Sequence, residues 1–126
     1  MIINHNESRL QDDYFLKGEG DAYFNRKLRM SNVQKEDDLI FSSIARMKIK
    51  PKSVLEIGCA NGFRLNWLYQ DFKCDAIGIE PSKQAVDDGN EKFPNVKLQV
   101  GTFDILESIK SSFDTIILGF FFICIA

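Results

Sequence analysis

The stretch Val54-Leu55-Glu56-Ile57-Gly58-Cys59-Ala60-Asn61-Gly62 decides the fold of this chain. The short apolar run over residues 53–57 ends at a glycine, which is typical of a buried parallel strand. Gly58, Ala60 and Gly62 have little or no side chain, so the backbone can turn sharply there and approach a ligand closely. The stretch therefore predicts a strand, a tight turn and the start of a helix whose N–H groups point at the ligand.

Apolar segments of alternating strand and helix character follow this turn. After residue 62 we expect a helix and then a strand over 75–79. The next helix would tolerate Pro81 in its first turn, and Ser82 would be able to cap it. We then expect a strand over 96–100, a short helix or turn over 105–109, and a central strand over 113–123. This order predicts an α/β fold, a Rossmann-like parallel sheet with flanking helices.

The N-terminal side of the turn predicts one helix and an irregular arm. Ser31 and Gln34 fit a capping box, and apolar residues then recur at helical spacing as far as Met47. Residues 1–30 show no clean periodicity. We therefore divide the chain into an N-terminal arm over 1–30 and a cofactor-binding domain over 31–126.

Two acids define the kind of cofactor. Glu80 directly follows the second predicted strand, 18 residues beyond Gly62, where a carboxylate accepts hydrogen bonds from ribose hydroxyls. Glu56 lies two residues before Gly58, and a carboxylate there would repel a pyrophosphate but suit a positively charged group. The glycine spacing is Gly-x-Ala-x-Gly, which differs from the Gly-x-Gly-x-x-Gly of a dinucleotide site.

Residues 53–126 resemble the N-terminal half of a class I methyltransferase dependent on S-adenosylmethionine (SAM). The stretch 56–62 resembles the first motif of that family, with Ala60 in place of the usual middle glycine. The segments that resemble the later motifs are Ile79-Glu80-Pro81-Ser82, Gly101-Thr102-Phe103-Asp104 and Phe113-Asp114-Thr115-Ile116-Ile117. Thr102 stands where many members have an acid.

This resemblance implies SAM as the cofactor and methyl transfer as the reaction. The cofactor-binding residues that it implies are Glu56, Gly58, Cys59, Ala60, Gly62, Glu80, Pro81, Thr102, Phe103, Asp104 and Gly119. Glu56 would serve the methionyl end, directly or through water, and Glu80 would bind the ribose. The resemblance leaves open whether Phe103 or Asp104 contacts the adenine. Asp104 is equally suited to cap the segment after it, and Phe103 is also suited to the core.

Other side chains near the turn have simpler expected roles. We expect Cys59 to be a small filler and Arg64 to be solvated, while Phe63 and Trp67 belong to the core. No residue stands out as a catalytic base. Methyl transfer to a good nucleophile can proceed mainly through proximity and orientation.

Composition excludes several classes of function. The net charge of −2 over 126 residues argues against a strongly basic nucleic-acid surface. The three cysteines form no CxxC pair and the single histidine is remote from them, so no metal site is expected. The apolar run over 115–126 is too short to span a bilayer, and the odd number of cysteines favours free thiols in the cytoplasm.

Two other functions stay open at this point. The first is an NAD-dependent Rossmann oxidoreductase, which Glu80 also suits. The second is a non-catalytic interaction module, because an apolar strand over 120–126 would be exposed at the edge of a sheet truncated after its fourth strand and would favour an oligomer. For a methyltransferase the acceptor is left open, with a small molecule among the candidates.

Overall fold

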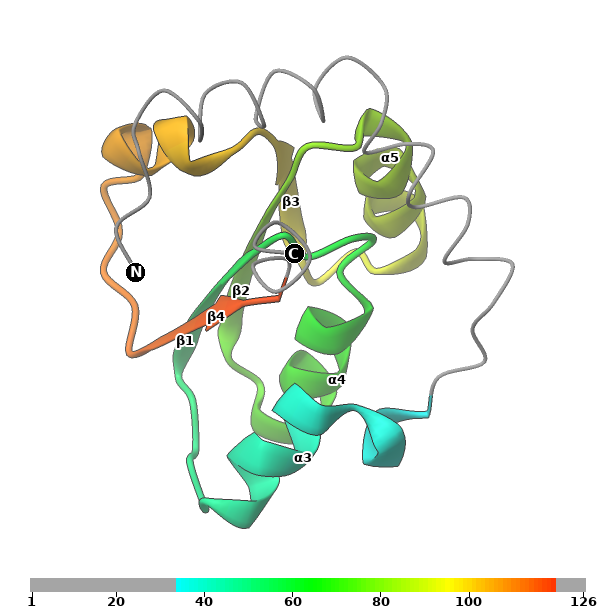
Figure 1. The fold of residues 1–126 in the computed structure, drawn as a ribbon, viewed down its shortest axis with the longest axis vertical. Coiled ribbons are helices and arrows are strands. Elements are labelled where there is room, and N and C mark those ends of the chain that lie inside the picture. Colours follow the sequence, from blue (N-terminus) through cyan, green and yellow to red (C-terminus); the bar gives the residue numbers. More distant parts are fainter. Residues whose placement is uncertain (1–33, 120–126) are drawn as a thin grey trace, which may run out of the picture.

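The computed structural model describes residues 34–119. Its strands form one four-stranded parallel sheet in the order β3-β2-β1-β4 (Figure 1). The strands are β1 (Ser53–Ile57), β2 (Asp75–Glu80), β3 (Lys97–Val100) and β4 (Thr115–Leu118). Because all four are parallel, their carboxyl ends meet at one edge, which is where ligands bind in such sheets. The expected Rossmann-like α/β fold is confirmed.

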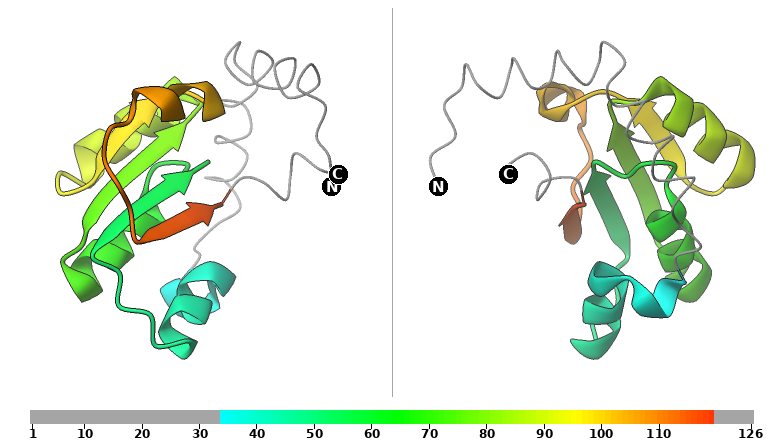
Figure 2. Two further views of the ribbon diagram at one scale, coloured as in Figure 1. Left: turned by 90° about the vertical axis from the view of Figure 1, so that its left-hand side faces the viewer. Right: turned by 45° about the vertical axis from the view of Figure 1, so that its right-hand side comes forward.

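Helices cover the two faces of the sheet unequally. The α-helices are α3 (Leu39–Arg46), α4 (Phe63–Phe72) and α5 (Lys83–Lys92), and the 3-10 helices are η2 (Lys35–Asp37) and η3 (Phe103–Ser108). The α-helices pack on one face, and η3 with the segment after it packs on the other (Figure 2). The sheet is therefore the middle layer of the described part of the chain.

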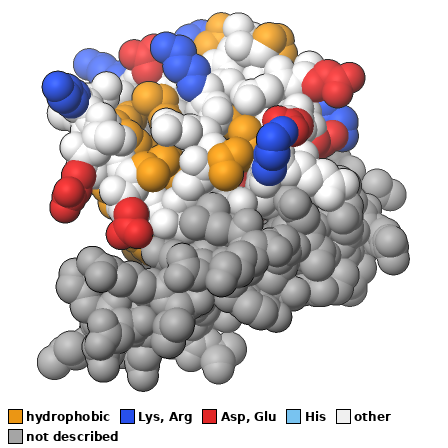
Figure 3. All heavy atoms as spheres, turned by 90° about the horizontal axis from the view of Figure 1, so that it is seen from above, with side chains coloured by type: hydrophobic (Ala, Val, Ile, Leu, Met, Phe, Trp, Pro, Cys, Tyr) orange, Lys and Arg blue, Asp and Glu red, His pale blue; other side chains and the backbone are white. Residues whose placement is uncertain are grey.

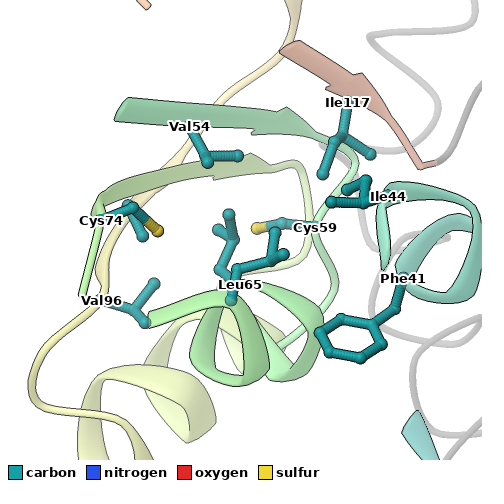
Figure 4. Packing of buried hydrophobic residues seen from close by; sticks show 10 residues of the cluster. Phe41, Ile44, Val54, Cys59, Leu65, Cys74, Val96 and Ile117 are labelled. Carbon is teal, nitrogen blue, oxygen red and sulfur yellow. The ribbon is translucent and has the colours of Figure 1, made fainter. Parts of the chain in front are cut away.

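The alternation of side chains along β1 explains this arrangement. Val54 packs in the larger core cluster with residues of α3 and α4, whereas Leu55 and Ile57 pack in the smaller cluster beneath η3. Figure 4 shows Leu65 of α4 and Cys59 of the turn between the helix and the strands. Both faces of β1 are thus buried, as the apolar run predicts for an inner parallel strand.

Within residues 34–119, the first α-helix begins later than the capping box predicts. Ser31 lies outside the described residues, and Gln34 is extended at the start of η2. The N-cap of α3 is Asp38, whose carboxylate accepts a hydrogen bond of 2.8 Å from the Phe41 N–H. The expected continuous helix was wrong over residues 34–38, because Gln34 and Asp38 are extended and Asp38 caps the α-helix that begins at Leu39.

The helix after β2 begins at its expected cap. Ser82 is the N-cap of α5, and its hydroxyl accepts a hydrogen bond of 3.1 Å from the Ala85 N–H. Pro81 precedes this cap and so is not in the first turn as expected. A proline is compatible with this position because it precedes the helix, where its missing N–H removes no intrahelical hydrogen bond.

The fourth strand is not central within the described residues. There β4 pairs with β1 alone and lies at the edge of the sheet. Ile116 and Leu118 are 59% and 40% exposed. Residues 120–123 of the expected strand, and the apolar segment that continues to Ala126, lie outside the described residues.

Both signs of charge occur on the surface of the described part. Figure 3 shows acidic and basic side chains interspersed on one face, with hydrophobic side chains between them. Within residues 34–119, the helices are too short or too polar to cross a membrane.

Candidate functional site

Three residues of the turn between β1 and α4 have positive φ angles, in the left-handed region of backbone conformation. The φ angles of Gly58, Ala60 and Gly62 are 76°, 53° and 83°. The N–H groups of Gly58 and Cys59 both donate to the carbonyl oxygen of Ile79, at 2.8 and 3.3 Å. The sharp turn that the small residues predict is therefore present, and it is tied to the end of β2.

Glu80, the last residue of β2, is a buried acid held by backbone donors. Its Oε1 accepts from the Ala60 N–H at 3.0 Å, and its Oε2 accepts from the Ser82 N–H at 2.7 Å. Each oxygen of a carboxylate has two lone pairs, so it can accept more than one hydrogen bond. The acid expected to bind ribose thus also connects the turn to the start of α5.

Glu56 is held in a different way, by an ion-pair network. Its Oε2 accepts from Arg64 Nη1 at 2.6 Å. Arg64 in turn donates from Nε and Nη2 to the two carboxylate oxygens of Asp38, at 2.9 and 2.8 Å. One guanidinium from the first turn of α4 therefore joins β1 to the N-cap of α3.

The network is buried, and this shapes its electrostatics. Glu56 is fully buried, and burial raises its pKa to about 7 although the charge and hydrogen bond of Arg64 lower it. Burial also acts to raise the pKa of Asp38, but hydrogen bonds from Arg64 and the Phe41 N–H outweigh this and lower it. Arg64 was expected to be solvated, but its side chain is only 11% exposed, so that expectation was wrong.

The second oxygen of Glu56 gives the site its main chemical property. Among the described residues, Oε1 of Glu56 is buried and has no hydrogen-bond partner. A buried carboxylate oxygen without a partner is costly, and a cation that donates hydrogen bonds would satisfy it. The hydrogen-bond acceptor at the end of β1 therefore fits a positively charged group such as an ammonium.

Gly119 encloses the same ion pair from the end of β4. Its N–H donates to the carbonyl oxygen of Ile57 at 3.1 Å. A Cβ at this position would lie 2.8 Å from Oε2 of Glu56 and 2.9 Å from Nη1 of Arg64. The absence of a side chain at residue 119 thus lets the backbone approach the pair, and Gly119 lies beside the end of β1.

Residues 102–104 follow β3 at the same edge of the sheet. The Gly101 N–H donates to the carbonyl oxygen of Glu80 at 3.0 Å, which places this segment beside the second acid. Thr102 is buried and is itself the N-cap of η3, so Asp104 does not cap that helix. Phe103 is 44% exposed and Asp104 is also exposed, so Phe103 does not belong to the core.

The sequence interpretation missed three residues that shape the site. Two are Asp38 and Arg64, and the third is Asn61, whose amide donates to Asp88 at 3.0 Å while its carbonyl oxygen accepts from the Phe63 N–H at 3.2 Å. An acid directly before an apolar helical run is a recognised capping signal and could have identified Asp38. The pairing of Arg64 has no local sequence signal.

Cys59 has the packing role expected of it. Its side chain is 1% exposed, and burial raises the pKa of its thiol well above the ordinary value. A neutral buried thiol is a poor nucleophile. Any contribution of Cys59 to ligand binding would therefore come from its backbone.

Comparison with protein families gives a match over most of the described sheet. A family model described as a methyltransferase domain matches residues 54–125, which is more than half of the chain. This range begins on β1 and includes the turn and both acids. No curated protein sequence matches the chain.

Solved structures share the fold at low sequence identity. The plantazolicin methyltransferase BamL, in complex with a triazolic desmethylPZN analog and SAH, is 21% identical, with a TM-score of 0.61 over 87% of this chain and 44% of its own. A TehB-like SAM-dependent methyltransferase from Corynebacterium glutamicum is 18% identical, with a TM-score of 0.55 over 82% and 54%. The SAH-bound methyltransferase of Podospora anserina is 24% identical, with a TM-score of 0.53 over 92% and 58%. This chain therefore spans about half the length of these structures.

Proposed function

The chain belongs to the methyltransferase domain family, and from this premise we propose that it binds SAM at the carboxyl edge of its sheet for transfer of the methyl group to an acceptor. The observation that carries the proposal is the buried carboxylate of Glu56, which has one oxygen bound to Arg64 and the other without a partner among the described residues. SAM has a cationic amino group and a cationic sulfonium. A site with an unsatisfied buried carboxylate favours such a ligand over an anionic one.

Glu80 supports the same assignment from the neighbouring strand. Its oxygens hold the N–H groups of Ala60 and Ser82, so the carboxylate is fixed in orientation before any ligand arrives. Fixed acceptors lose little entropy on binding, and two adjacent ribose hydroxyls can each donate to one oxygen. We assign the ribose to Glu80.

The segment after β3 is the candidate for the adenine. Phe103 is partly exposed beside the end of β2 and offers an aromatic surface to a base. Thr102 and Asp104 flank it. We assign the adenine to this segment, and the backbone of Gly58–Gly62 to the part of the cofactor between ribose and amino group.

The chemistry asked of this chain is binding and orientation. SAM, when bound, supplies an activated methyl group that a nucleophile can displace directly. The residues of this chain would hold the donor so that the nucleophile approaches in line, and such positioning can supply much of the rate enhancement. Gly119, which has no side chain, lets the backbone lie close to Glu56 and Arg64, where a Cβ would be in steric conflict.

An NAD-dependent oxidoreductase is the second candidate, and Glu56 argues against it. A pyrophosphate at this turn would face the carboxylate of Glu56, and like charges in a buried site repel strongly. Glu80 alone does not distinguish the two functions, because both cofactors contain a ribose.

Thermal unfolding of the full 126-residue chain with each ligand tests the proposal. We expect SAM and its demethylated product SAH to raise Tm by several degrees at saturating concentration, and NAD to leave Tm unchanged. The control is Glu91→Gln, which removes an exposed acid and should keep the full shift. Equal shifts with NAD and SAM, or none with SAM, would reject the assignment.

We also propose that the protein works in a reducing compartment, the cytoplasm. Cys59 and Cys74 are both free thiols buried in the core. Free thiols persist where the environment is reducing. The acceptor that we propose is a small molecule, and methylation of candidate acceptors by the purified chain would identify it.

A further inference from the structure

The guanidinium of Arg64 is fixed by two bonds before it reaches Glu56. Nε and Nη2 both bind the carboxylate of Asp38, which is itself anchored by the Phe41 N–H as the N-cap of α3. A planar guanidinium held by such a fork cannot rotate. Nη1 is therefore aimed at one oxygen of Glu56, and that oxygen is Oε2.

Two carboxylates share this one guanidinium, so their charges affect each other. Arg64 favours the ionised form of Glu56, whereas the negative charge of Asp38 disfavours it. The negative charge of Glu80 acts on the pKa of Glu56 in the same sense as Asp38, and the thiol of Cys59 stays neutral. The charge on Glu56 is thus set by a balance between α3, α4 and β2.

We propose that Arg64 and Asp38 are positioning residues for Glu56. Arg64 binds one carboxylate oxygen so that the other is presented to the cationic amino group of the cofactor, and Asp38 orients Arg64 and shares its positive charge with Glu56. This inference rests on the proposed function for the identity of the cation. The role of the two residues toward Glu56 itself follows from the ligand-free geometry. Oε1 of Glu56, which has no hydrogen-bond partner within residues 34–119, is the observation that connects the two.

The proposal makes Arg64 and Asp38 act in opposite directions. Weakening the guanidinium should raise the pH at which Glu56 loses its proton. Removing the charge of Asp38 should lower that pH, because an opposing charge is gone and Arg64 then serves Glu56 alone. General loss of stability would not produce shifts of opposite sign.

The variants to compare are conservative, so that the fold is retained. Asp38→Asn keeps an oxygen that can accept from the Phe41 N–H, and asparagine is a good N-cap. Arg64→Lys keeps the positive charge but loses the fork. Matched controls are Asp37→Asn and Arg46→Lys, which change exposed residues of the same types nearby. Glu56→Gln removes the titrating group.

The first measurement is the affinity of the full chain for SAH, by calorimetric titration from pH 5.5 to 8.5. SAH keeps the amino group of the cofactor. We expect wild-type affinity to rise about tenfold or more across this range as Glu56 ionises. The midpoint should move down by about one pH unit in Asp38→Asn and up by about one in Arg64→Lys. The two controls should follow the wild type, and Glu56→Gln should show no such rise.

The second measurement is the ligand-free unfolding free energy of the same proteins, by urea titration over the same pH range. The midpoint of its pH dependence should shift in the same opposite directions. If wild type binds no SAH at any pH, the proposed function fails, and the urea profiles alone decide whether Arg64 and Asp38 control Glu56. Midpoints that coincide or shift in one direction overturn the inference. Opposite shifts in urea without matching shifts in SAH affinity overturn its cofactor part.

Discussion

The ends of β1 and β2 each bear a buried glutamate, and the two are held by different partners. Glu80 has both oxygens bound by backbone N–H groups, from Ala60 and Ser82. Glu56 has one oxygen bound by the side chain of Arg64 and one without a partner among the described residues. The orientation of a carboxylate held by backbone N–H groups is determined by the fold. The orientation and charge of a carboxylate held by a single side chain depend on that side chain and on pH. Glu80 therefore stabilises the turn, whereas Glu56 has one carboxylate oxygen for which residues 34–119 provide no partner.

Removal of Arg64 should cause the largest loss of unfolding free energy among the variants that test this difference. Arg64→Met leaves the carboxylates of Glu56 and Asp38 buried and without their cation. Breaking a buried ion pair from one side costs about 3–5 kcal/mol of unfolding free energy. Urea denaturation at pH 8 measures this, with Arg46→Met as the exposed control. A loss below about 1 kcal/mol, the range of an exposed pair, would show that the network is not buried in solution.

The second largest effect should be a pH dependence of the unfolding free energy that comes from Glu56. The folded pKa of Glu56 is about 7, above its ordinary value of 4.5, so between these pH values the folded state binds more protons than the unfolded state. The unfolding free energy should therefore fall as pH rises from 4.5 to 7, by an amount on the order of 3 kcal/mol.

Urea titration of wild type and Glu56→Gln at pH 5 and pH 7.5 checks this dependence. The variant should lack the decrease and should equal or exceed wild type at pH 7.5, because a neutral amide is cheaper to bury than an ionised acid. Asp38 titrates below its ordinary 3.8, outside this window. Parallel profiles for the two proteins would argue against a raised pKa at Glu56.

Glu80→Gln should reduce stability where Glu56→Gln does not. An amide can accept from only one of the Ala60 and Ser82 N–H groups, and its own N–H₂ then faces the other donor. A buried donor left without an acceptor costs about 1–3 kcal/mol. The test is the difference in unfolding free energy between the two variants at pH 7.5, with Glu91→Gln as control. Equal stability of Glu80→Gln and Glu91→Gln would contradict the backbone contacts assigned to Glu80.

Ala60→Gly should cause the smallest change in unfolding free energy. Ala60 has a φ of 53°, which is strained for a residue with a Cβ by about 1–2 kcal/mol. Glycine relieves this strain but makes the unfolded chain more flexible, at a cost of about 0.4–1 kcal/mol. We expect a net gain of at most about 1 kcal/mol in urea denaturation. A clear loss would mean that the Ala60 methyl group makes a packing contribution of its own.

The sequence predicted β1, the turn, α4 and β2 closely because their signals are local. A short apolar run, small residues at the turn and an acid at the next strand end each identify a neighbouring feature. Ser82 was identified as a cap for the same reason. The ion-pair network was not predicted, because Arg64 pairs with partners 26 and 8 residues away, and only the packing of α3 and α4 on one face of the sheet brings them together.

The start of α3 shows how two local signals can compete. Ser31 with Gln34 is the cap that the sequence predicts, whereas Asp38, which also satisfies a capping pattern, is missing from that prediction. In the structure Asp38 is the cap, and the same carboxylate binds Arg64. A residue that serves both local and long-range partners is favoured by tertiary packing, which sequence periodicity does not include.

Calorimetric titration of the full chain with SAH at pH 8, beside Glu56→Gln and Glu80→Gln, tests the central claim most directly. We expect one saturable site in wild type and at least about tenfold weaker binding in each variant, since each loses a charge-assisted hydrogen bond worth about 1.5–3 kcal/mol. Glu91→Gln should bind as wild type does. Heat indistinguishable from buffer dilution in wild type would contradict the claim, as would unchanged affinity in both acid variants.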